Sequence, residues 1–279
     1  MAKENYNRLR GQLRTDIAYL KNADGEITTA VFPLTVIRRN IYNRAGNLDA
    51  QFDRPIIATA DKEMIRCAQQ LQKHDIIDIK GMFRTRQSKK KLKCPHCGST
   101  VIIEMPIATI EPVYIGVVED RLNNVTDGTN YLLHCAEISN EAKVIGRVCT
   151  PTENIISGET DRGDIYARYQ LAVNRKLYIK GSIDEEDHTD YPFVYSYKDV
   201  AQSDLAVLQQ GALIYLDGYI HTMQYDKETT CPDCGQDFTF QCQRMNLTPY
   251  ANEYLRDFKD DVLESTLFNI DQDEPDRGY

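Results

Sequence analysis

The sequence contains no tryptophan among its 279 residues, although it has 17 tyrosines. No apolar stretch approaches the ~20 residues that a membrane-spanning helix needs, and the opening MAKENYNRLRGQLR includes no apolar leader segment. We therefore expect a cytoplasmic protein without a membrane anchor. The sequence also shows no nucleophile–base pair, no phosphate-cradling glycine loop and no acidic metal cluster, so we expect no enzyme.

The net charge of −9 conceals an asymmetry between the two ends of the chain. Residues 1–112 carry 19 Lys and Arg against 12 Asp and Glu, whereas the remainder carries 14 against 30. A basic front and an acidic back indicate a polyanionic partner for the front and a different task for the back. The alternative is that the charges serve only solubility.

The chain contains an internal duplication. A CPxCG pattern occurs at residues 94–98 and again at 231–235, which is an offset of 137 residues. Segments 53–87 and 190–224 align at the same offset without a gap. Such an ungapped match indicates two copies of one structural unit.

Each copy predicts the same order of elements. Three strands with alternating or continuous apolar residues precede a helical segment, and a fourth strand, the CPxCG turn and a fifth strand follow. This is the plan of the OB-fold. We therefore predict a mostly β protein of two tandem OB-fold barrels, each a five-stranded Greek key with a short helix and a long hairpin that carries the CPxCG turn. The expected parts are a first domain at 1–112, a connector at 113–141, a second domain at 142–250 and an acidic tail at 251–279.

The second copy resembles a known family. The segments GRVCT, ARYQLAVNR, DYPFVYSYKDVAQSDLAVLQQ and GALIYLDGYIHT, in this order within residues 142–225, are similar to the bacterial single-stranded DNA-binding proteins. The resemblance implies base stacking on Tyr191, Tyr197 and Tyr225, which fall on three stacking positions of that family. The first copy resembles the family more weakly and has Arg54, Ala60 and Ser88 at those positions. The CPxCG turns are not part of the family's common pattern.

A basic segment, FRTRQSKKKLK, occupies the fourth strand of the first copy and the loop that follows it. That loop commonly borders the ligand in OB-folds, so phosphate contacts are expected there. The alternatives are a solvated hairpin tip for the lysines and ordinary strand packing for the tyrosines. Residues 140–250 carry 10 basic and 17 acidic residues, which disfavours phosphate binding by the second copy. The candidate nucleic-acid-binding residues are Phe83, Arg84, Arg86, Lys89, Lys90, Lys91, Lys93, Tyr191, Tyr197 and Tyr225.

The CPHC and CPDC turns suit either a redox dithiol or half of a zinc site. Redox catalysis favours a first cysteine at a helix N-terminus, whereas a strand is expected after both turns. Two CPxCG turns facing each other form a four-thiolate zinc site. We therefore expect one zinc ion shared by Cys94, Cys97, Cys231 and Cys234. The alternatives are separate sites that recruit Cys242 or His96, or turns without metal.

These features predict a single-stranded DNA-binding protein that acts in replication, recombination or the transfer of plasmids or other mobile elements. The acidic tail would recruit replication or recombination proteins, and homo-oligomers are possible. The competing hypothesis is a non-catalytic interaction scaffold of a replication or transfer complex that has lost DNA binding.

Overall fold

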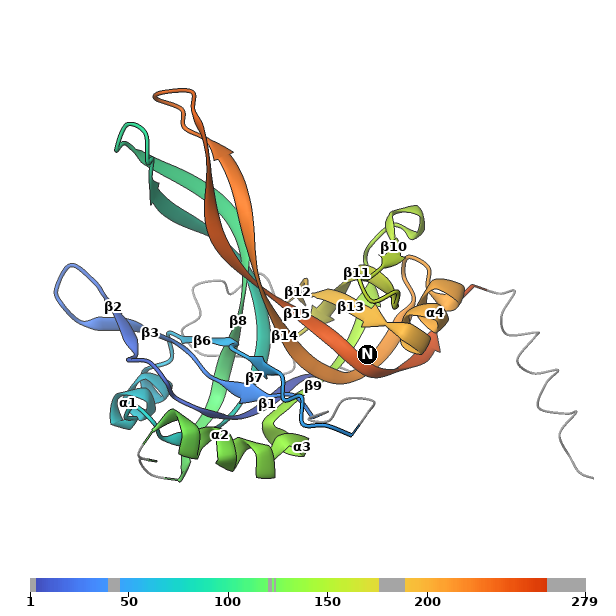
Figure 1. Ribbon diagram of the computed structural model, residues 1–279, viewed down its shortest axis with the longest axis horizontal. Helices are drawn as coiled ribbons and strands as arrows, with labels where there is room; N and C mark the ends of the chain where they lie inside the picture. Colours follow the sequence, from blue (N-terminus) through green and yellow to red (C-terminus); the bar gives the residue numbers. More distant parts are fainter. Residues whose placement is uncertain (1–3, 40–45, 120–121, 123, 176–188, 260–279) are drawn as a thin grey trace, which may run out of the picture.

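The computed structural model describes residues 4–39, 46–119, 122, 124–175 and 189–259. The first copy is a barrel with one helix beside it (Figure 1). Its elements are β1 (Asn5–Gln12), β2 (Ala18–Lys21), β3 (Ile27–Pro33), β4 (Val36–Ile37), β5 (Phe52–Asp53), β6 (Ile56–Thr59), α1 (Lys62–Gln70), β7 (Ile76–Lys93) and β8 (Thr100–Glu119).

The second copy repeats this order after two connecting helices, α2 (Val125–His134) and α3 (Ala136–Ser139). Its elements are β9 (Asn140–Val148), η1 (Thr152–Asn154), β10 (Ile156–Glu159), β11 (Ile165–Asn174), β12 (Thr189–Asp190), β13 (Phe193–Tyr197), α4 (Lys198–Val207), β14 (Leu213–Thr230) and β15 (Asp237–Arg256). No described helix has the length and apolar character needed to cross a membrane.

The two copies agree in detail where their backbones are irregular. The β7–β8 ladder shifts register between Lys80 and Gly81, and the β14–β15 ladder shifts between Asp217 and Gly218, which are 137 residues later. At both glycines an added Cβ would collide with the backbone of the neighbouring strand. Glycine is therefore required at this bend of each barrel.

The barrels join through antiparallel pairing of their first strands, β1 and β9. Asn5 pairs with Val144, Leu9 pairs with Asn140, and Asn7 faces Ala142 at the centre of the ladder. Since Asn5 and Asn140 are equivalent in the two copies, the copies are related by a pseudo-twofold axis through the centre of this ladder. One continuous sheet of 13 strands results, and it includes strands of both barrels.

Two further contacts, related by the pseudo-twofold axis, connect the copies. The Asp53 side chain, which is fully buried, accepts two hydrogen bonds from Arg38 of its own copy, at 2.7 and 3.1 Å. It also accepts one from the backbone N–H of Thr222 in the other copy, at 2.7 Å. The symmetry-related contact has the same form and consists of Arg175, Asp190 and the backbone N–H of Thr85.

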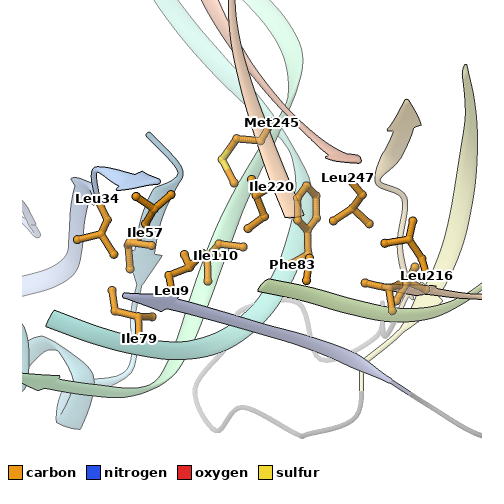
Figure 2. Packing of buried hydrophobic residues seen from close by; sticks show 14 of the residues in the cluster. Leu9, Leu34, Ile57, Ile79, Phe83, Ile110, Leu216, Ile220, Met245 and Leu247 are labelled. Atoms are coloured by element: carbon orange, nitrogen blue, oxygen red, sulfur yellow. The ribbon is translucent and has the colours of Figure 1, made fainter. Parts of the chain in front are cut away.

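Apolar side chains from both copies form one contiguous core (Figure 2). Phe83 and Ile220 occupy equivalent places in it. The Asn5 side chain bonds both backbone groups of Phe83, at 2.8 and 2.9 Å, and the Asn140 side chain does the same for Ile220, at 2.9 and 3.0 Å. Each asparagine amide thus satisfies buried peptide groups that would otherwise be costly.

The strands extend beyond the domain boundaries expected from the sequence. β8 continues to Glu119, past residue 112, because it pairs with the start of β7. β15 likewise continues to Arg256, past residue 250, by pairing with β14. The stretch expected to be a connector therefore begins as barrel strand, and the expected acidic tail begins the same way. Recruitment of partners by the rest of the tail concerns residues 260–279, which lie outside the described residues.

Candidate metal cluster and nucleic-acid face

Two long hairpins, β7–β8 and β14–β15, project from the barrels on the same side of the molecule (Figure 1). Each ends in a CPxCG turn of the same geometry. In the first, the N–H of Gly98 donates to the carbonyl of Cys94 at 2.9 Å; in the second, the N–H of Gly235 donates to Cys231 at 2.9 Å. Both glycines have positive φ values, 76° and 69°, which other residues rarely adopt.

The two turns bring four thiols into one cluster, formed by Cys94, Cys97, Cys231 and Cys234, and their sulfur atoms lie within 4.8 Å of one another. Between hairpins, the Cys94 and Cys234 sulfurs are 3.8 Å apart, and the Cys97 and Cys231 sulfurs are 3.7 Å apart. A tetrahedron of thiolates with Zn–S bonds of about 2.3 Å has edges of about 3.8 Å. The cluster could therefore hold a metal ion of this coordination type.

The cluster has supporting contacts from both hairpins. The Ser99 hydroxyl lies 2.9 Å from the Cys97 sulfur and 3.4 Å from that of Cys231. Its hydrogen bond lowers the pKa of the Cys231 thiol to about 6, which favours the thiolate that a metal binds. A small apolar core beneath the cluster includes Val101 and Phe238.

The other readings of these cysteines have less support. Strands β8 and β15 follow the turns, so neither first cysteine lies at the helix N-terminus that thiol redox catalysis favours. Cys242 lies on β15 of the second hairpin, and its side chain is buried. Within the residues that the structure describes, the four-cysteine cluster is the one group of metal-ligating side chains found, and it includes neither Cys242 nor His96.

The second barrel presents a row of aromatic side chains on the outer side of β11 and β13. Alternation along β13 buries Val194 and Ser196 and leaves Phe193, Tyr195 and Tyr197 half-exposed. Across the ladder, Tyr166 pairs with Tyr197. We call this surface the second-barrel face, and it consists of Tyr166, Arg168, Phe193, Tyr195 and Tyr197.

Arginine side chains lie among these rings. The Arg168 guanidinium carbon is 4.5 Å from the Phe193 ring centroid and 5.7 Å from that of Tyr195. Arg244, on β15, donates a hydrogen bond of 3.0 Å to the Tyr195 hydroxyl. Its guanidinium carbon also lies 4.7 Å from the Tyr225 ring centroid. Flat rings for bases and guanidinium groups for phosphates are thus side by side.

Of the three tyrosines expected to stack bases, Tyr197 belongs to the second-barrel face, and Tyr191 and Tyr225 lie beside it. Tyr191 precedes β13 and is 44% exposed. Tyr197 is half-buried at the end of β13, and this burial raises the pKa of its hydroxyl. Tyr225 lies on β14, where Arg244 connects it to Tyr195. Four neighbours of these tyrosines were not predicted from the sequence: Arg168, Phe193, Tyr195 and Arg244. The alternation in YPFVYSY already places Phe193 and Tyr195 on the same side as Tyr191 and Tyr197.

The basic segment of the first copy divides into buried and exposed parts. The Phe83 side chain is only 1% exposed and packs in the core, so a base cannot reach its ring; this corrects its placement among the binding residues. Arg84 is also buried and forms an ion pair of 3.0 Å with Glu111. Burial raises the pKa of the Glu111 carboxyl, which the Arg84 charge opposes. Arg84 is therefore committed to the fold, whereas Arg86 is exposed.

Beyond Arg86 the lysines alternate between two sides of the first hairpin. Lys90 faces the second hairpin, where its ammonium donates to the Gln241 carbonyl at 2.9 Å and lies 5.2 Å from the Phe240 ring centroid. The outward side carries three exposed residues, which we call the lysine row: Lys89, Lys91 and Lys93. Among the described residues, only Lys89 of this row has a carboxylate within 4.0 Å; it is Glu104, at 3.2 Å, and both groups are exposed. Such a pair contributes little and yields readily to a phosphate.

The comparisons with known proteins show the fold. Crystal structures of single-stranded DNA-binding proteins align over nearly the whole chain. A deletion mutant from Thermus aquaticus matches with a TM-score of 0.61 at 15% identity, covering 93% of this chain and 99% of that one. The wild-type protein of the same organism matches with a TM-score of 0.61 at 13% identity, covering 92% and 95%. No protein-family model and no curated protein sequence matches the chain. The predicted tandem OB-fold is thereby confirmed.

Proposed function

We propose that this protein binds single-stranded DNA without catalysis. The observation that carries the proposal is the second-barrel face, where half-exposed rings of β11 and β13 lie beside Arg168 of β11 and Arg244 of β15. Each base stacked on an aromatic ring contributes ~1–3 kcal/mol. The similar crystal structures belong to single-stranded DNA-binding proteins, which adds support. This chemistry fits a protein that protects exposed single strands in replication, recombination or the transfer of plasmids or other mobile elements.

The strand would continue from the second-barrel face onto the first hairpin. Tyr225 and Arg244 lie on the second hairpin, and Lys90 bridges to that hairpin from the first. The lysine row then offers cations two residues apart along an extended strand, a spacing of about 6.8 Å. This arrangement adds phosphate contacts to those that Arg168 and Arg244 offer on the acidic second copy.

We propose that the four-cysteine cluster holds one zinc ion. Four thiolates in a closed set, with sulfur separations that match a tetrahedron, fit a structural zinc site. Zinc would supply a cross-link between the hairpin tips. The protein's own contacts between the tips include the small apolar core at the cluster, the bond from Lys90 and the contact of His96 with the Asp237 carbonyl.

A binding titration tests the main proposal. Fluorescence anisotropy of a labelled oligothymidine should report tight binding at low salt that weakens steeply as salt rises. No binding at low salt would instead support an interaction scaffold. Replacing Tyr191, Tyr197 and Tyr225 together should weaken binding, and replacing Lys89, Lys91 and Lys93 should reduce the salt dependence.

Elemental analysis tests the metal. Purified protein should contain about one zinc per chain, and Cys97→Ser should lose it because three thiolates remain. Cys149→Ser is the matched control, since Cys149 bonds only the Gln170 carbonyl and lies outside the cluster. About two zinc ions per chain, or zinc retained in Cys97→Ser, would contradict a shared site.

A further inference from the structure

The position of Tyr191 in the second copy is occupied by Arg54 in the first. Both residues make the same backbone contact with the opposite hairpin: the N–H of Tyr191 donates to the Thr85 hydroxyl at 2.8 Å, and the N–H of Arg54 donates to the Thr222 hydroxyl at 2.9 Å. Both side chains are exposed. The duplication has thus placed a guanidinium where the other copy has a ring.

Arg54 has a ring and a second arginine beside it. The chain is extended through Phe52 and Asp53, and the Asp53 side chain points inward to Arg38. Because side chains alternate along an extended segment, Phe52 and Arg54 point the other way. Arg14 lies over Phe52 with its guanidinium carbon 5.6 Å from the ring centroid.

Neither guanidinium has a carboxylate as a partner among the described residues. Arg14 donates to the side-chain oxygens of Gln12, at 2.9 Å, and Thr129, at 2.8 Å, which are both uncharged. Arg54 forms no ion pair with a described carboxylate. Burial lowers the pKa of Arg14, and the nearby charge of Arg54 lowers it further. Arginine stays protonated regardless, so two like charges share this surface, and neither has a carboxylate partner in the part of the chain that the structure describes.

The second copy has no such charge at the same place. Its residues equivalent to Arg14, Phe52 and Arg54 are Cys149, Thr189 and Tyr191. The cations therefore belong to the first copy alone, which otherwise lacks the stacking residues. Two guanidinium groups flanking a ring fit a phosphate with an adjacent sugar or base.

We propose that Arg14, Phe52 and Arg54 form a phosphate-binding site for the backbone of the single strand, at the base of the hairpins in the first copy. The inference rests on the proposed function. It assigns base stacking to the second copy and phosphate binding to the first at equivalent positions. One strand in contact with both barrels would then use rings on one and guanidinium groups on the other.

The test is the salt dependence of oligothymidine binding by the full chain. Each phosphate contact with a single strand contributes about 0.7 to the slope of log affinity against log salt. Arg54→Gln should lower the slope by about that amount, so a tenfold rise in salt should cost the variant about fivefold less affinity than the wild type. Arg54→Lys should keep most of the slope, because it keeps the charge.

Arg66→Gln is the matched control, since Arg66 is an exposed arginine of the same copy, on α1. Its slope should equal that of the wild type. Arg14→Gln should lower the slope in the same way as Arg54→Gln. Because Arg14 also bonds Thr129, the melting temperature of the Arg14→Gln variant is compared with that of the wild type. Arg54 is exposed, so the Arg54→Gln variant is the deciding test. A slope unchanged in Arg54→Gln, with tight wild-type binding, overturns this site alone. No binding by the wild type overturns both proposals.

Discussion

The two copies share one backbone plan, yet they present different outer faces. On β11 and β13 the second copy exposes Tyr166, Arg168, Phe193, Tyr195 and Tyr197. The equivalent residues of the first copy, 137 positions earlier, are Thr29, Val31, Ile56, Ala58 and Ala60. No ring or cation remains at these five positions. At these positions the second copy combines aromatic rings with the Arg168 guanidinium, whereas the first copy has kept neither kind of contact.

The two hairpins differ in charge, and here the basic residues belong to the first copy. Where the first copy has Lys89, Lys91 and Lys93, the second has Asp226, Glu228 and Thr230. The lysine row of the first hairpin therefore has no basic counterpart at the equivalent positions of the second hairpin. By contrast, the buried contacts of Asp53 and Asp190 are the same in both, because they hold the copies together.

The barrel interiors diverge as well. In the second copy Asp204 is fully buried and accepts hydrogen bonds from the hydroxyls of Tyr169 and Tyr254, at 3.0 and 2.8 Å, and from the amide of Asn252. The equivalent residues of the first copy are Cys67, Phe32, Val117 and Ile115. A polar network in one copy thus replaces apolar packing in the other.

The largest effect is expected for the buried aspartate contacts, which both copies share. Asp53→Ala and Asp190→Ala should each lower the free energy of unfolding by about 3–5 kcal/mol, because each removes a fully buried carboxylate that an arginine of its own copy and a backbone N–H of the other copy both bond. Urea denaturation measures the loss. Asp226→Ala, at an exposed site on β14, should change it by less than about 0.5 kcal/mol. A large loss in only one of the two aspartate variants would show that the shared contacts are not equivalent.

The next effect tests the aromatic contrast. Tyr195→Ala should weaken oligothymidine binding by ~1–3 kcal/mol, or about 5- to 150-fold, because one stacking ring is lost. Anisotropy titrations at fixed salt measure it. Tyr215→Ala removes a half-buried tyrosine of β14 that is not part of the second-barrel face and should bind like the wild type. Equal losses in the two variants would count against the second-barrel face.

A smaller effect tests the charge contrast between the hairpins. Lys91→Gln should lower the salt slope of DNA binding by about 0.7, since one phosphate contact disappears. Glu228→Gln, at the equivalent position of the second copy, should leave the slope unchanged. The slopes come from titrations across a range of salt concentrations. The reverse ranking of these two variants would place the strand on the second hairpin instead.

The smallest effect tests the interior contrast through pH. Burial raises the pKa of the Asp204 carboxyl above its ordinary value. Between the ordinary pKa of an aspartate and the raised pKa of Asp204, the folded protein holds a proton that the unfolded chain has released. The contribution of Asp204 to the free energy of unfolding therefore falls as pH rises through this window and is constant above it. Asp204→Asn should remove this fall, as seen in urea denaturation from about pH 4 to about pH 7. Cys67→Ser, at the equivalent place in the first copy, should leave the pH dependence as in the wild type.

Much of this architecture could be predicted because the duplication can be read directly from the sequence. The constant offset of 137 residues implies two hairpins of equal length, each with a CPxCG turn at its tip. Once the two copies pair, the turns are therefore expected to lie next to each other. Phe83 and Arg84 were misplaced because both faces of β7 are buried at this point of the strand, so alternation marks neither side as exposed there. Arg168 and Arg244 were missed because the aromatic rings that they contact lie on other strands. The register between strands is set by tertiary pairing, which the sequence does not show. The strand ends of β8 and β15 depend on pairing in the same way.

The ladder between β1 and β9 lies within a single chain. Two separate subunits would have to find each other, and their pairing would weaken on dilution. Here the connecting segment keeps the partners at a high effective concentration, so this ladder persists however scarce the protein is. At the centre of the ladder Asn7 faces Ala142, a mismatch that a symmetric homodimer could not contain. Linkage in one polypeptide is what allows the two halves to specialise independently.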